Sequence, residues 1–379
     1  MRLRLLTLLA ALALIASACG GSDADGVAAT AEPGPTPTAT ATAEPEPEPT
    51  EPPTPEPTAT AEPEPEPTPE PEVESEPELE DPAEATAVSG CGVGVDPGTT
   101  AQVFQSEGRE RTYQLLIPAL YDRDTPTPVV LNWHGLGSDG PQQLGFSDYS
   151  NIAHRETFIV VAPTGIPAPG TDRNSWELDD SDPTRDDLVL FDDLLSDLTS
   201  SLCIDESRIY TTGMSNGGYF SSLLVCEAAD RIAAAASVAA LHHADDCEPS
   251  RPVPYIGFHG TDDATVPYYG GGGSSLLPEG VTIELFEPAI PDEFAEFAAD
   301  FGCDAEPVES TIGDDVTKYD YQNCAVEMTF YGIENAGHTW PGSPVSLAIS
   351  EGFGLGVTND DINATELSWE FFSRHALDQ

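Results

Sequence analysis

Basic residues are scarce in this chain of 379 residues, which holds 13 lysines and arginines against 67 aspartates and glutamates. Lys318 is the single lysine, and the formal net charge is −54 at pH 7. A surface of this sign repels phosphate groups, so it excludes a nucleic acid or an anionic membrane surface as the partner of the folded part. Such dense carboxylates also suggest a saline habitat, where they stay hydrated and screened.

Motifs that hold a metal are also lacking. None of the seven cysteines forms a CxxC pair, and no histidine stands at ligand spacing beside a cysteine. Zinc sites are built from cysteine and histidine at such spacings, so we expect no metal site of this kind. His242 and His243, followed by Asp245 and Asp246, leave two alternatives open, namely an ion site and a solvated loop.

The apolar run over residues 5–15 is too short to span a bilayer as a helix. Two arginines precede this run, and small residues lead from it to Cys19. We therefore predict a lipoprotein-type signal peptide with a lipobox over residues 1–19, with Cys19 as the lipid attachment site and the lipid as the membrane contact. The alternative is an ordinary secretory signal that happens to contain a cysteine.

Large apolar residues are almost absent from residues 20–89, which hold 17 of the 36 prolines, interleaved with glutamate, threonine and alanine. A core cannot form without large apolar residues, and proline and repelling charges keep the chain extended. We predict a disordered Pro/Glu/Thr-rich tether over residues 20–89, whose reach at about 3.1 Å per residue is on the order of 200 Å. With the signal, this tether predicts an extracellular protein held at the cell surface.

Residues 90–379 are numerous enough for one large domain, and their 48 acids and 11 bases give this domain a net charge of −37. Short runs rich in β-branched and aromatic residues alternate there with helix-like stretches. This alternation predicts an α/β fold with a mostly parallel central sheet and helices on both faces. The expected strands cover residues 113–117, 129–133, 158–162, 209–212, 234–240, 253–258 and 326–333, and the expected helices cover residues 186–202, 219–229, 294–301 and 366–377.

Six cysteines remain when Cys19 is set aside, and an even number in an exported protein predicts three disulfides. Sequence alone cannot choose strictly among the possible connectivities. The pairs that we expect are Cys303 with Cys324, which bracket a short hairpin-like segment, Cys226 with Cys247, and Cys91 with Cys203.

Ser215 lies in the segment Gly213-Met214-Ser215-Asn216-Gly217-Gly218, between an apolar run and a helix-like stretch. A nucleophilic serine on a tight strand-to-helix turn is flanked by glycines, because a side chain there would clash with the neighbouring backbone. The free N–H groups at the helix N-terminus favour the negative charge that develops during attack. Ser215 is therefore the predicted nucleophile, although so short a pattern needs partners to support it.

The partners come from loops that follow later predicted strands. Asp262 and Asp263 follow the strand at residues 253–258, and His338 follows the last strand. A serine hydroxyl needs a base to take its proton, and the base needs a carboxylate to hold its orientation. The order serine, aspartate, histidine along the chain is that of the α/β-hydrolase fold. The sequence thus predicts a triad of Ser215, one of the two aspartates, and His338.

A further loop, Trp133-His134-Gly135-Leu136-Gly137, directly follows the run at residues 129–133. Its glycines allow a tight fold in which the N–H of Leu136 and the N–H of Asn216 both point at the carbonyl oxygen of a bound ester. We predict that these two groups form the oxyanion hole. His134 and His259 stand beside glycine turns, and we expect both to be structural.

Together, residues 212–218, residues 259–268 and residues 337–342 resemble the polyhydroxybutyrate depolymerase and feruloyl or acetylxylan esterase family. The resemblance covers about residues 111–377. It implies that Asp263, not Asp262, is the acid of the triad. The segment at residues 185–191 resembles a structural segment of that family with paired aspartates, and we expect Asp186 and Asp187 to cap a helix rather than to act in catalysis.

Three tryptophans are candidates for substrate binding. Trp340 resembles a tryptophan on the substrate side of the family's site. Trp176 lies in a loop that leads to the segment with paired aspartates, where it either lines the cleft or packs inside. Trp133 departs from the residues that relatives often carry, which leaves the shape of the acyl pocket open.

The resemblance implies an exported serine carboxylesterase that needs no cofactor. Its expected partner is an ester-bearing polymer or oligomer, either a polyhydroxyalkanoate chain or a polysaccharide with feruloyl or acetyl groups, and the protein is expected to be a monomer. One alternative is a serine peptidase of the same fold, which would bring a large propeller or lid domain for which the length leaves no room. The other is a catalytically dead hydrolase that binds surfaces.

Overall fold

The computed structural model describes residues 89–178, 184–277 and 282–378. The predicted signal peptide, the lipid site Cys19 and all but the end of the predicted tether lie outside these residues, and they stay predictions. Within the described ranges, no helix is both long enough and apolar enough to cross a membrane.

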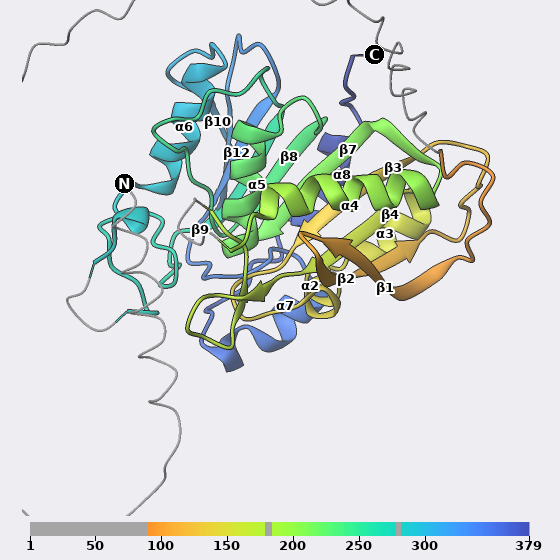
Figure 1. Cartoon of the computed structure of the whole chain (residues 1–379). Coiled ribbons are helices and arrows are strands. Elements are labelled where there is room, and N and C mark those ends of the chain that lie inside the picture. Colours follow the sequence, from red (N-terminus) through yellow and green to blue (C-terminus); the bar gives the residue numbers. More distant parts are fainter. Residues whose placement is uncertain (1–88, 179–183, 278–281, 379) are drawn as a thin grey trace, which may run out of the picture. The chain divides into compact units, whose positions relative to one another are not determined.

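One ten-stranded sheet organises the domain, in the order β1-β2-β4-β3-β7-β8-β9-β12-β11-β10 (Figure 1). The six strands from β4 to β12 in this order pair in parallel. Antiparallel strands extend the sheet at both edges, β1 and β2 on one side and β11 and β10 on the other. The strands are β1 (Gly98–Ser106), β2 (Arg109–Ile117), β3 (Thr127–Trp133), β4 (Ile159–Thr164), β7 (Ile204–Met214), β8 (Ala234–Val238), β9 (Tyr255–Gly260), β10 (Val308–Ile312), β11 (Val316–Asp320) and β12 (Met328–Ile333).

The central strands are buried on both faces, and most of their residues are apolar. Every residue of β3, β8, β9 and β12 is buried, whereas β10 at the edge is exposed along most of its length. Strands covered on both faces read as continuous hydrophobic runs rather than as alternating patterns. The runs in the sequence therefore predict these strands correctly.

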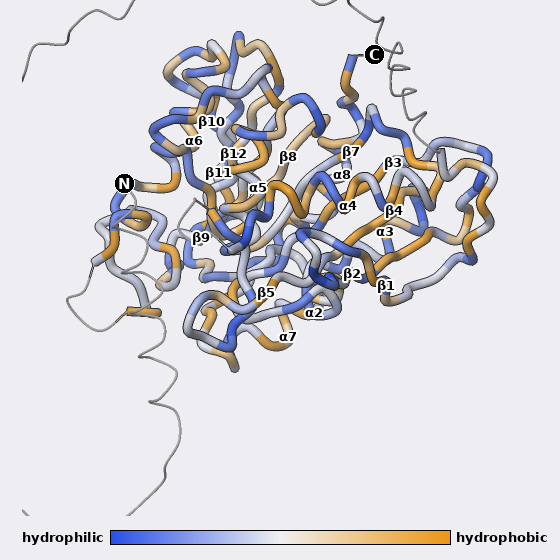
Figure 2. Tube along the Cα trace, viewed as in Figure 1, coloured by the Kyte–Doolittle hydropathy of each residue, from blue (hydrophilic) through white to orange (hydrophobic). Residues whose placement is uncertain are grey.

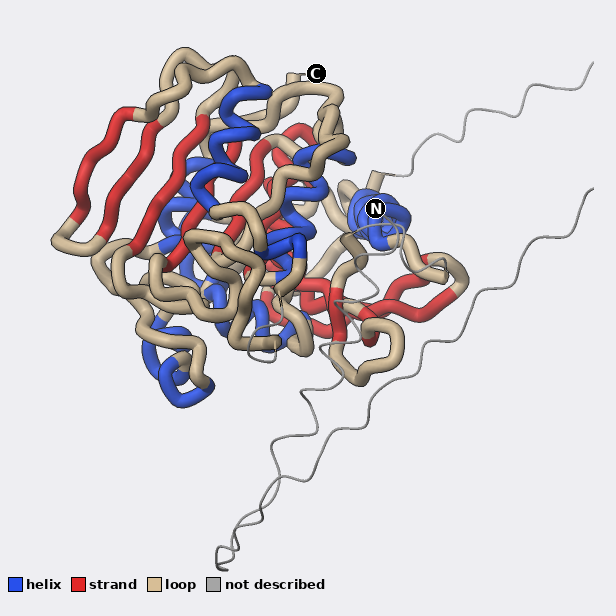
Figure 3. Tube along the Cα trace, turned by 90° about the vertical axis from the view of Figure 1, so that its left-hand side faces the viewer, coloured by secondary structure: helices blue, strands red, loops and turns tan. Residues whose placement is uncertain are grey.

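Helices cover the two faces of the sheet and form two separate cores (Figures 1 and 3). Leu194, Phe220 and Phe294, from α4, α5 and α6, belong to one core. Ile152 and Trp369, from α3 and α8, belong to the other, together with Leu144 of α2. Hydrophobic residues run through β8 in the interior, whereas the outer loops mix hydrophilic and hydrophobic residues (Figure 2). The helices are α2 (Gly140–Ser147), α3 (Tyr149–Glu156), α4 (Asp187–Ser201), α5 (Asn216–Glu227), α6 (Ile290–Asp300), α7 (Pro344–Ile349) and α8 (Ala364–Phe372).

This architecture confirms the predicted α/β fold class, with a mostly parallel sheet between two layers of helices. Each predicted strand and helix has a counterpart, with ends that differ by a few residues. Asp186 caps α4 as expected, because its side chain accepts hydrogen bonds from the N–H groups of Leu188 and Val189. The hairpin-like segment expected between Cys303 and Cys324 is the hairpin of β10 and β11, whereas the edge strand β1 and the helices α2, α3 and α7 were not expected from the sequence.

All three predicted disulfides are present. Cys303 pairs with Cys324 across the hairpin of β10 and β11, and Cys226 pairs with Cys247. The third bond joins Cys91 to Cys203. It fastens the first described residues to the end of α4, where Gly90 also donates its N–H to the Thr199 carbonyl oxygen.

Candidate active site

Ser215 stands on a sharp turn between β7 and α5. Its backbone has φ 57° and ψ −122°, a conformation with positive φ that costs a non-glycine residue energy and persists only where the surroundings enforce it. A Cβ at Gly217 would lie 2.2 Å from the Trp133 carbonyl oxygen, and one at Gly213 would lie 2.3 Å from the Gly217 carbonyl oxygen. Only glycine fits at these positions, so the pattern of the sequence follows from the packing of the turn.

The neighbouring parallel strands β9 and β12 bring the acid and the histidine together. Asp263 follows β9, His338 follows β12, and the Nδ1 of His338 donates a hydrogen bond of 2.7 Å to the Oδ2 of Asp263. Both side chains are buried, with 4% of each residue exposed. Asp262 is exposed instead. The structure thus places Asp263, and not its neighbour, beside the histidine.

The carboxylate of Asp263 is held by donors on both oxygens. Its Oδ1 accepts hydrogen bonds from the N–H groups of Thr265 at 2.8 Å and Val266 at 2.9 Å. Its Oδ2 lies 2.7 Å from His338 and 3.3 Å from the Nε2 of His259. Burial acts to raise the pKa of this carboxyl, but charge and hydrogen bonding from the two histidines outweigh burial and hold the pKa well below its usual range. Asp263 therefore stays ionised at neutral pH.

The oxyanion loop follows β3, which is the parallel neighbour of β7, so it ends beside the turn that carries Ser215. A Cβ at Gly135 would lie 3.3 Å from the Cβ of Ser215. Leu136, Ser215 and Asn216 line the same cavity. Asn216 is the first residue of α5, where backbone N–H groups have no partner within the helix. The two predicted oxyanion residues are thus brought to the serine.

The short strand β6 (Asn174–Ser175), which pairs with β5 (Ile166–Pro167), holds the oxyanion loop from one side. Gly137 donates its N–H to the Asn174 carbonyl oxygen at 2.7 Å, and the Asn174 side chain donates to the Ser138 carbonyl oxygen at 2.9 Å. Arg173, which directly precedes β6, donates to the Leu136 carbonyl oxygen at 3.3 Å. These contacts fix the backbone of the loop that carries Leu136.

Trp176 ties the same segment to the start of α5. The Asn216 side chain accepts a hydrogen bond of 2.6 Å from the N–H of Trp176 and donates one of 3.2 Å to its carbonyl oxygen. The indole Nε1 of Trp176 donates to the His134 carbonyl oxygen at 2.8 Å. One tryptophan therefore joins both sides of the predicted oxyanion hole, a role that no local pattern in the sequence indicates.

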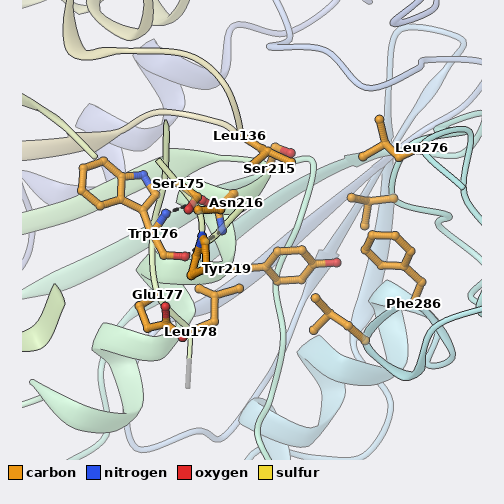
Figure 4. A pocket seen from close by; sticks show the side chains of 14 residues that line it. Leu136, Ser175, Trp176, Glu177, Leu178, Ser215, Asn216, Tyr219, Leu276 and Phe286 are labelled. Atoms are coloured by element: carbon orange, nitrogen blue, oxygen red, sulfur yellow. Dashed lines mark hydrogen bonds between the residues drawn. The ribbon is translucent and has the colours of Figure 1, made fainter. Parts of the chain in front are cut away.

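An open cavity of about 720 Å³, counted with the solvent at its mouth, lies beside Ser215 (Figure 4). Most of its wall is apolar, and Leu136, Leu178, Val266, Leu276 and Phe286 contribute to it. Apolar pockets with a few polar groups are typical ligand sites. The glycine run at residues 270–273 supports one wall, because Gly271 and Gly272 donate their N–H groups to the carbonyl oxygens of Glu287 and Phe286.

The structure corrects the prediction for two of the three tryptophans. Trp133 and Trp340 have no exposed surface, and each donates its indole N–H to a buried threonine, Thr211 at 2.8 Å and Thr365 at 2.9 Å respectively. Both fill core space, so neither can touch a substrate in this conformation. Trp176 is also mostly buried, but it lines the cavity. Of its two expected positions, it therefore has the one beside the cleft.

His134 is a structural residue, as expected. Its Nδ1 donates to the Gly135 carbonyl oxygen at 2.7 Å, and its Nε2 accepts the N–H of Gly165 at 2.9 Å. Burial lowers the pKa of this imidazole to about 4, so the ring is neutral at pH 7. His259 donates from Nε2 to the Val266 carbonyl oxygen at 2.8 Å, and this contact holds the loop that carries Asp263.

His242 and His243 lie on a loop whose Asp245 and Asp246 are exposed, as the solvated-loop alternative expects, but both histidines also contact acids of α6. The Nδ1 of His242 lies 2.9 Å from the Oε2 of Glu293, and the Nε2 of His243 lies 2.7 Å from the Oδ2 of Asp300. Both acids belong to α6, so the pair attaches the loop after β8 to this helix. Among the described residues, no group of three or more histidines, cysteines or acids is placed to hold a metal ion.

A buried ion-pair network that the sequence does not predict supports the cavity wall. Asp187 is buried and lies 3.3 Å from Arg111 and 2.8 Å from the Nε of Arg185. The Asp187 carboxylate also accepts the N–H of Glu177 at 2.8 Å, and Arg185 donates to the side chain of Ser175 at 3.2 Å. Glu177 and Ser175 line the cavity, so the network fixes their backbone.

Comparison with known proteins gives relatives but no family model, since none matches the chain. Feruloyl esterase B from Piromyces equi is 30% identical over 226 residues, which are 58% of this chain and 41% of the relative. Feruloyl esterase D from Neurospora crassa is 26% identical over 285 residues, 70% of this chain and 83% of the relative. A bifunctional acetylxylan esterase/xylanase from Neocallimastix patriciarum is 28% identical over 142 residues, 38% of this chain and 20% of the relative.

Among solved structures, an acetyl xylan esterase from Aspergillus awamori aligns with a TM-score of 0.47 at 14% identity, over 68% of this chain and all of that chain. Of the two feruloyl esterases, this chain spans 41% of the length of the Piromyces relative and 83% of the length of the Neurospora relative. The esterase homologues indicate a carboxylic ester hydrolase.

Proposed function

We propose that this protein is a serine carboxylesterase that hydrolyses acyl esters on polysaccharide. The observation that carries the proposal is the 2.7 Å hydrogen bond between His338 and Asp263, which are both buried. They follow the carboxyl ends of their strands, at the same edge of the sheet where Ser215 follows β7 and lines a cavity. In the proposal, Ser215 is the nucleophile, His338 the general base and acid, and Asp263 the residue that orients the imidazole.

The reaction runs in two steps. The Ser215 hydroxyl attacks the ester carbonyl while the Nε2 of His338 takes its proton, and the tetrahedral intermediate expels the alcohol, which receives that proton. Water then attacks the acyl-enzyme with the same imidazole as base, and the free acid leaves. Because its Nδ1 donates to Asp263, His338 has its Nε2 available to accept a proton from the serine.

The negative oxygen of each tetrahedral intermediate is stabilised by the N–H groups of Leu136 and Asn216. One such donor contributes about 3 to 4 kcal/mol to the stabilisation of the transition state. The contacts of Asn174 and Trp176 support this role, because they hold the two donors in place before the substrate arrives. Donors fixed in advance need no reorganisation during the reaction.

The substrate class follows from the names of the relatives, which are feruloyl and acetylxylan esterases. The polyhydroxyalkanoate alternative stays a prediction, because none of these relatives is described as acting on a polyester. Three disulfides support an extracellular location, since such bonds persist in oxidising compartments. Lipid attachment at Cys19 and a tether over residues 20–89 would keep the enzyme at the cell surface beside a bulky substrate.

The test is hydrolysis of p-nitrophenyl acetate and butyrate by the full chain and by Ser215→Ala. Ser200→Ala is the matched control, because Ser200 is an exposed serine on α4 outside the cavity. We expect loss of activity in the first variant and wild-type activity in the second. Equal rates for Ser215→Ala and wild type would refute the mechanism. A screen with methyl ferulate, acetylated xylan and hydroxybutyrate oligomers then assigns the ester class.

The same measurements separate the two alternatives. A serine peptidase of this fold would also cleave a peptide substrate added to the screen, which a carboxylesterase leaves intact, and a dead hydrolase would bind polysaccharide without releasing acid. The hydrogen bond between His338 and Asp263 favours an active enzyme over a dead one, because a binding protein has no need of a buried histidine and carboxylate in this arrangement.

A further inference from the structure

Tyr219 lies one helical turn after Ser215, in the first turns of α5, and its ring lines the cavity. The residue is 6% exposed, and its hydroxyl is buried without a hydrogen-bond partner among the residues that the structure describes. Figure 4 shows the ring lying across the cavity with the hydroxyl directed toward Phe286. The wall that it faces is therefore apolar.

Among the described residues, the hydroxyl of Tyr149 is also buried without a partner, but Tyr149 does not line the cavity. Three other buried tyrosines do have partners. The hydroxyl of Tyr113 donates to Asp197 at 2.8 Å, that of Tyr210 donates to the His375 carbonyl oxygen at 2.9 Å, and that of Tyr255 lies 2.7 Å from the hydroxyl of Ser237. A buried hydroxyl without a partner is unfavourable, and in native proteins it calls for a specific reason. A phenylalanine would fill the same space without this cost.

The hydroxyl of Tyr219 is a donor at any pH at which the protein works. Burial, and after it the negative charges of Asp263 and Glu293, raise the pKa of this phenol well above its ordinary value. A neutral phenol that lacks a partner in the free protein can donate to a group that arrives with the substrate.

We infer that the Tyr219 hydroxyl recognises a hydrogen-bond acceptor at the far end of the acyl group, and this inference rests on the proposed esterase function. An acetyl group has only a methyl carbon beyond its carbonyl, so it offers no such acceptor. The apolar cavity and the polar tip of Tyr219 together fit an acyl group with a flat apolar body and a hydroxyl or alkoxy oxygen at its end. Of the two ester classes, this selects hydroxyarylalkenoyl esters over acetyl esters.

The inference is tested with two esters that differ in one hydroxyl, methyl 4-hydroxycinnamate and methyl cinnamate. The full chain, Tyr219→Phe and Tyr269→Phe are compared by the ratio of kcat/KM for the two esters. Tyr269 is the matched control, because it is 71% exposed and does not line the cavity. We expect wild type and Tyr269→Phe to prefer the hydroxylated ester, and Tyr219→Phe to lose about 3- to 30-fold of that preference, the range for one hydrogen bond in a buried site.

A melting curve provides a second readout. Since the hydroxyl has no partner in the free protein, Tyr219→Phe should not lower the melting temperature, whereas Tyr255→Phe, which removes a partnered hydroxyl, should lower it. An unchanged ratio in Tyr219→Phe, or a loss of stability like that of Tyr255→Phe, would overturn the inference. Failure of the esterase proposal looks different, because Ser215→Ala would then retain the wild-type rate on every ester.

Discussion

Replacing Asp263 with asparagine keeps the size of the side chain but removes the negative charge that faces His338. The amide of the new side chain can still accept from the N–H groups of Thr265 and Val266, which now bond to Oδ1 at 2.8 and 2.9 Å. On the other side, Oδ2 accepts the hydrogen bond of His338 and lies 3.3 Å from the Nε2 of His259, and its position would be occupied by an NH₂ group. That group donates, so it forces His338 into the tautomer whose Nε2 carries a proton.

A histidine in that tautomer cannot take the proton of Ser215. Loss of the correct tautomer at a serine triad lowers kcat by about 10⁴-fold, which corresponds to about 5 kcal/mol of transition-state stabilisation. Because only transition-state contacts change, we expect KM to stay within about threefold of wild type. The fold should also persist, since the side chain keeps its volume and two of its hydrogen bonds.

The assay is steady-state hydrolysis of p-nitrophenyl butyrate, with the folded state of each variant checked by circular dichroism. Asp262→Asn is the matched control, because it removes one carboxylate from the adjacent, exposed residue. We expect this control to keep the wild-type kcat. The assignment of the acid would be wrong if Asp262→Asn lost more activity than Asp263→Asn, and the tautomer argument would be wrong if Asp263→Asn lost less than tenfold.

Three further predictions concern stability. Asp187→Asn leaves Arg111 and Arg185 buried without their counter-charge, so the free energy of unfolding should fall by about 3 to 5 kcal/mol. Unfolding in guanidinium chloride measures this. A loss below about 1 kcal/mol would contradict a stabilising role for the ion pairs of Asp187. Replacing Cys91 and Cys203 together by serine opens a loop of 112 residues and should lower the same quantity by about 2 to 5 kcal/mol. Reduction of the wild type, which breaks all three disulfides, should lower it at least as much. Burial lowers the pKa of His134 from 6.5 to about 4, so between these pH values the unfolded chain binds a proton more tightly than the native state does. The free energy of unfolding should therefore fall by about 3 kcal/mol between pH 7 and pH 4. A urea titration of His134→Gln at both pH values checks this, because the variant should lack that part of the fall.

The sequence predicts the centre of the fold well because local information is strong there. Buried parallel strands are apolar along most of their length, so β3, β8 and β9 stand out as runs. The turn at Ser215 must have glycine at Gly213 and Gly217, because the backbone of neighbouring segments lies where a Cβ would be. At such positions the packing restricts which residue types can occur, so the structure can be predicted from the sequence.

The rest depends on contacts between distant segments. β10 is exposed along most of its length and lacks the apolar run that marks a central strand. Trp133 and Trp340 stand beside functional loops, yet their side chains turn into the core, which the spacing of a motif cannot reveal. Asp187 meets Arg111 across 76 residues of chain, and this pairing becomes visible only once β2 and α4 are placed.

The disulfide between Cys91 and Cys203 also determines how the domain bears a mechanical load. A pull on the chain before Cys91 would otherwise reach β1 first, and β1 is an edge strand that can be peeled from β2 one hydrogen bond at a time. The disulfide diverts the force to Cys203, one residue before β7 in the middle of the sheet. Detaching β7 requires many hydrogen bonds on both of its sides to break together, so the domain would resist unfolding by a pull on its N-terminus.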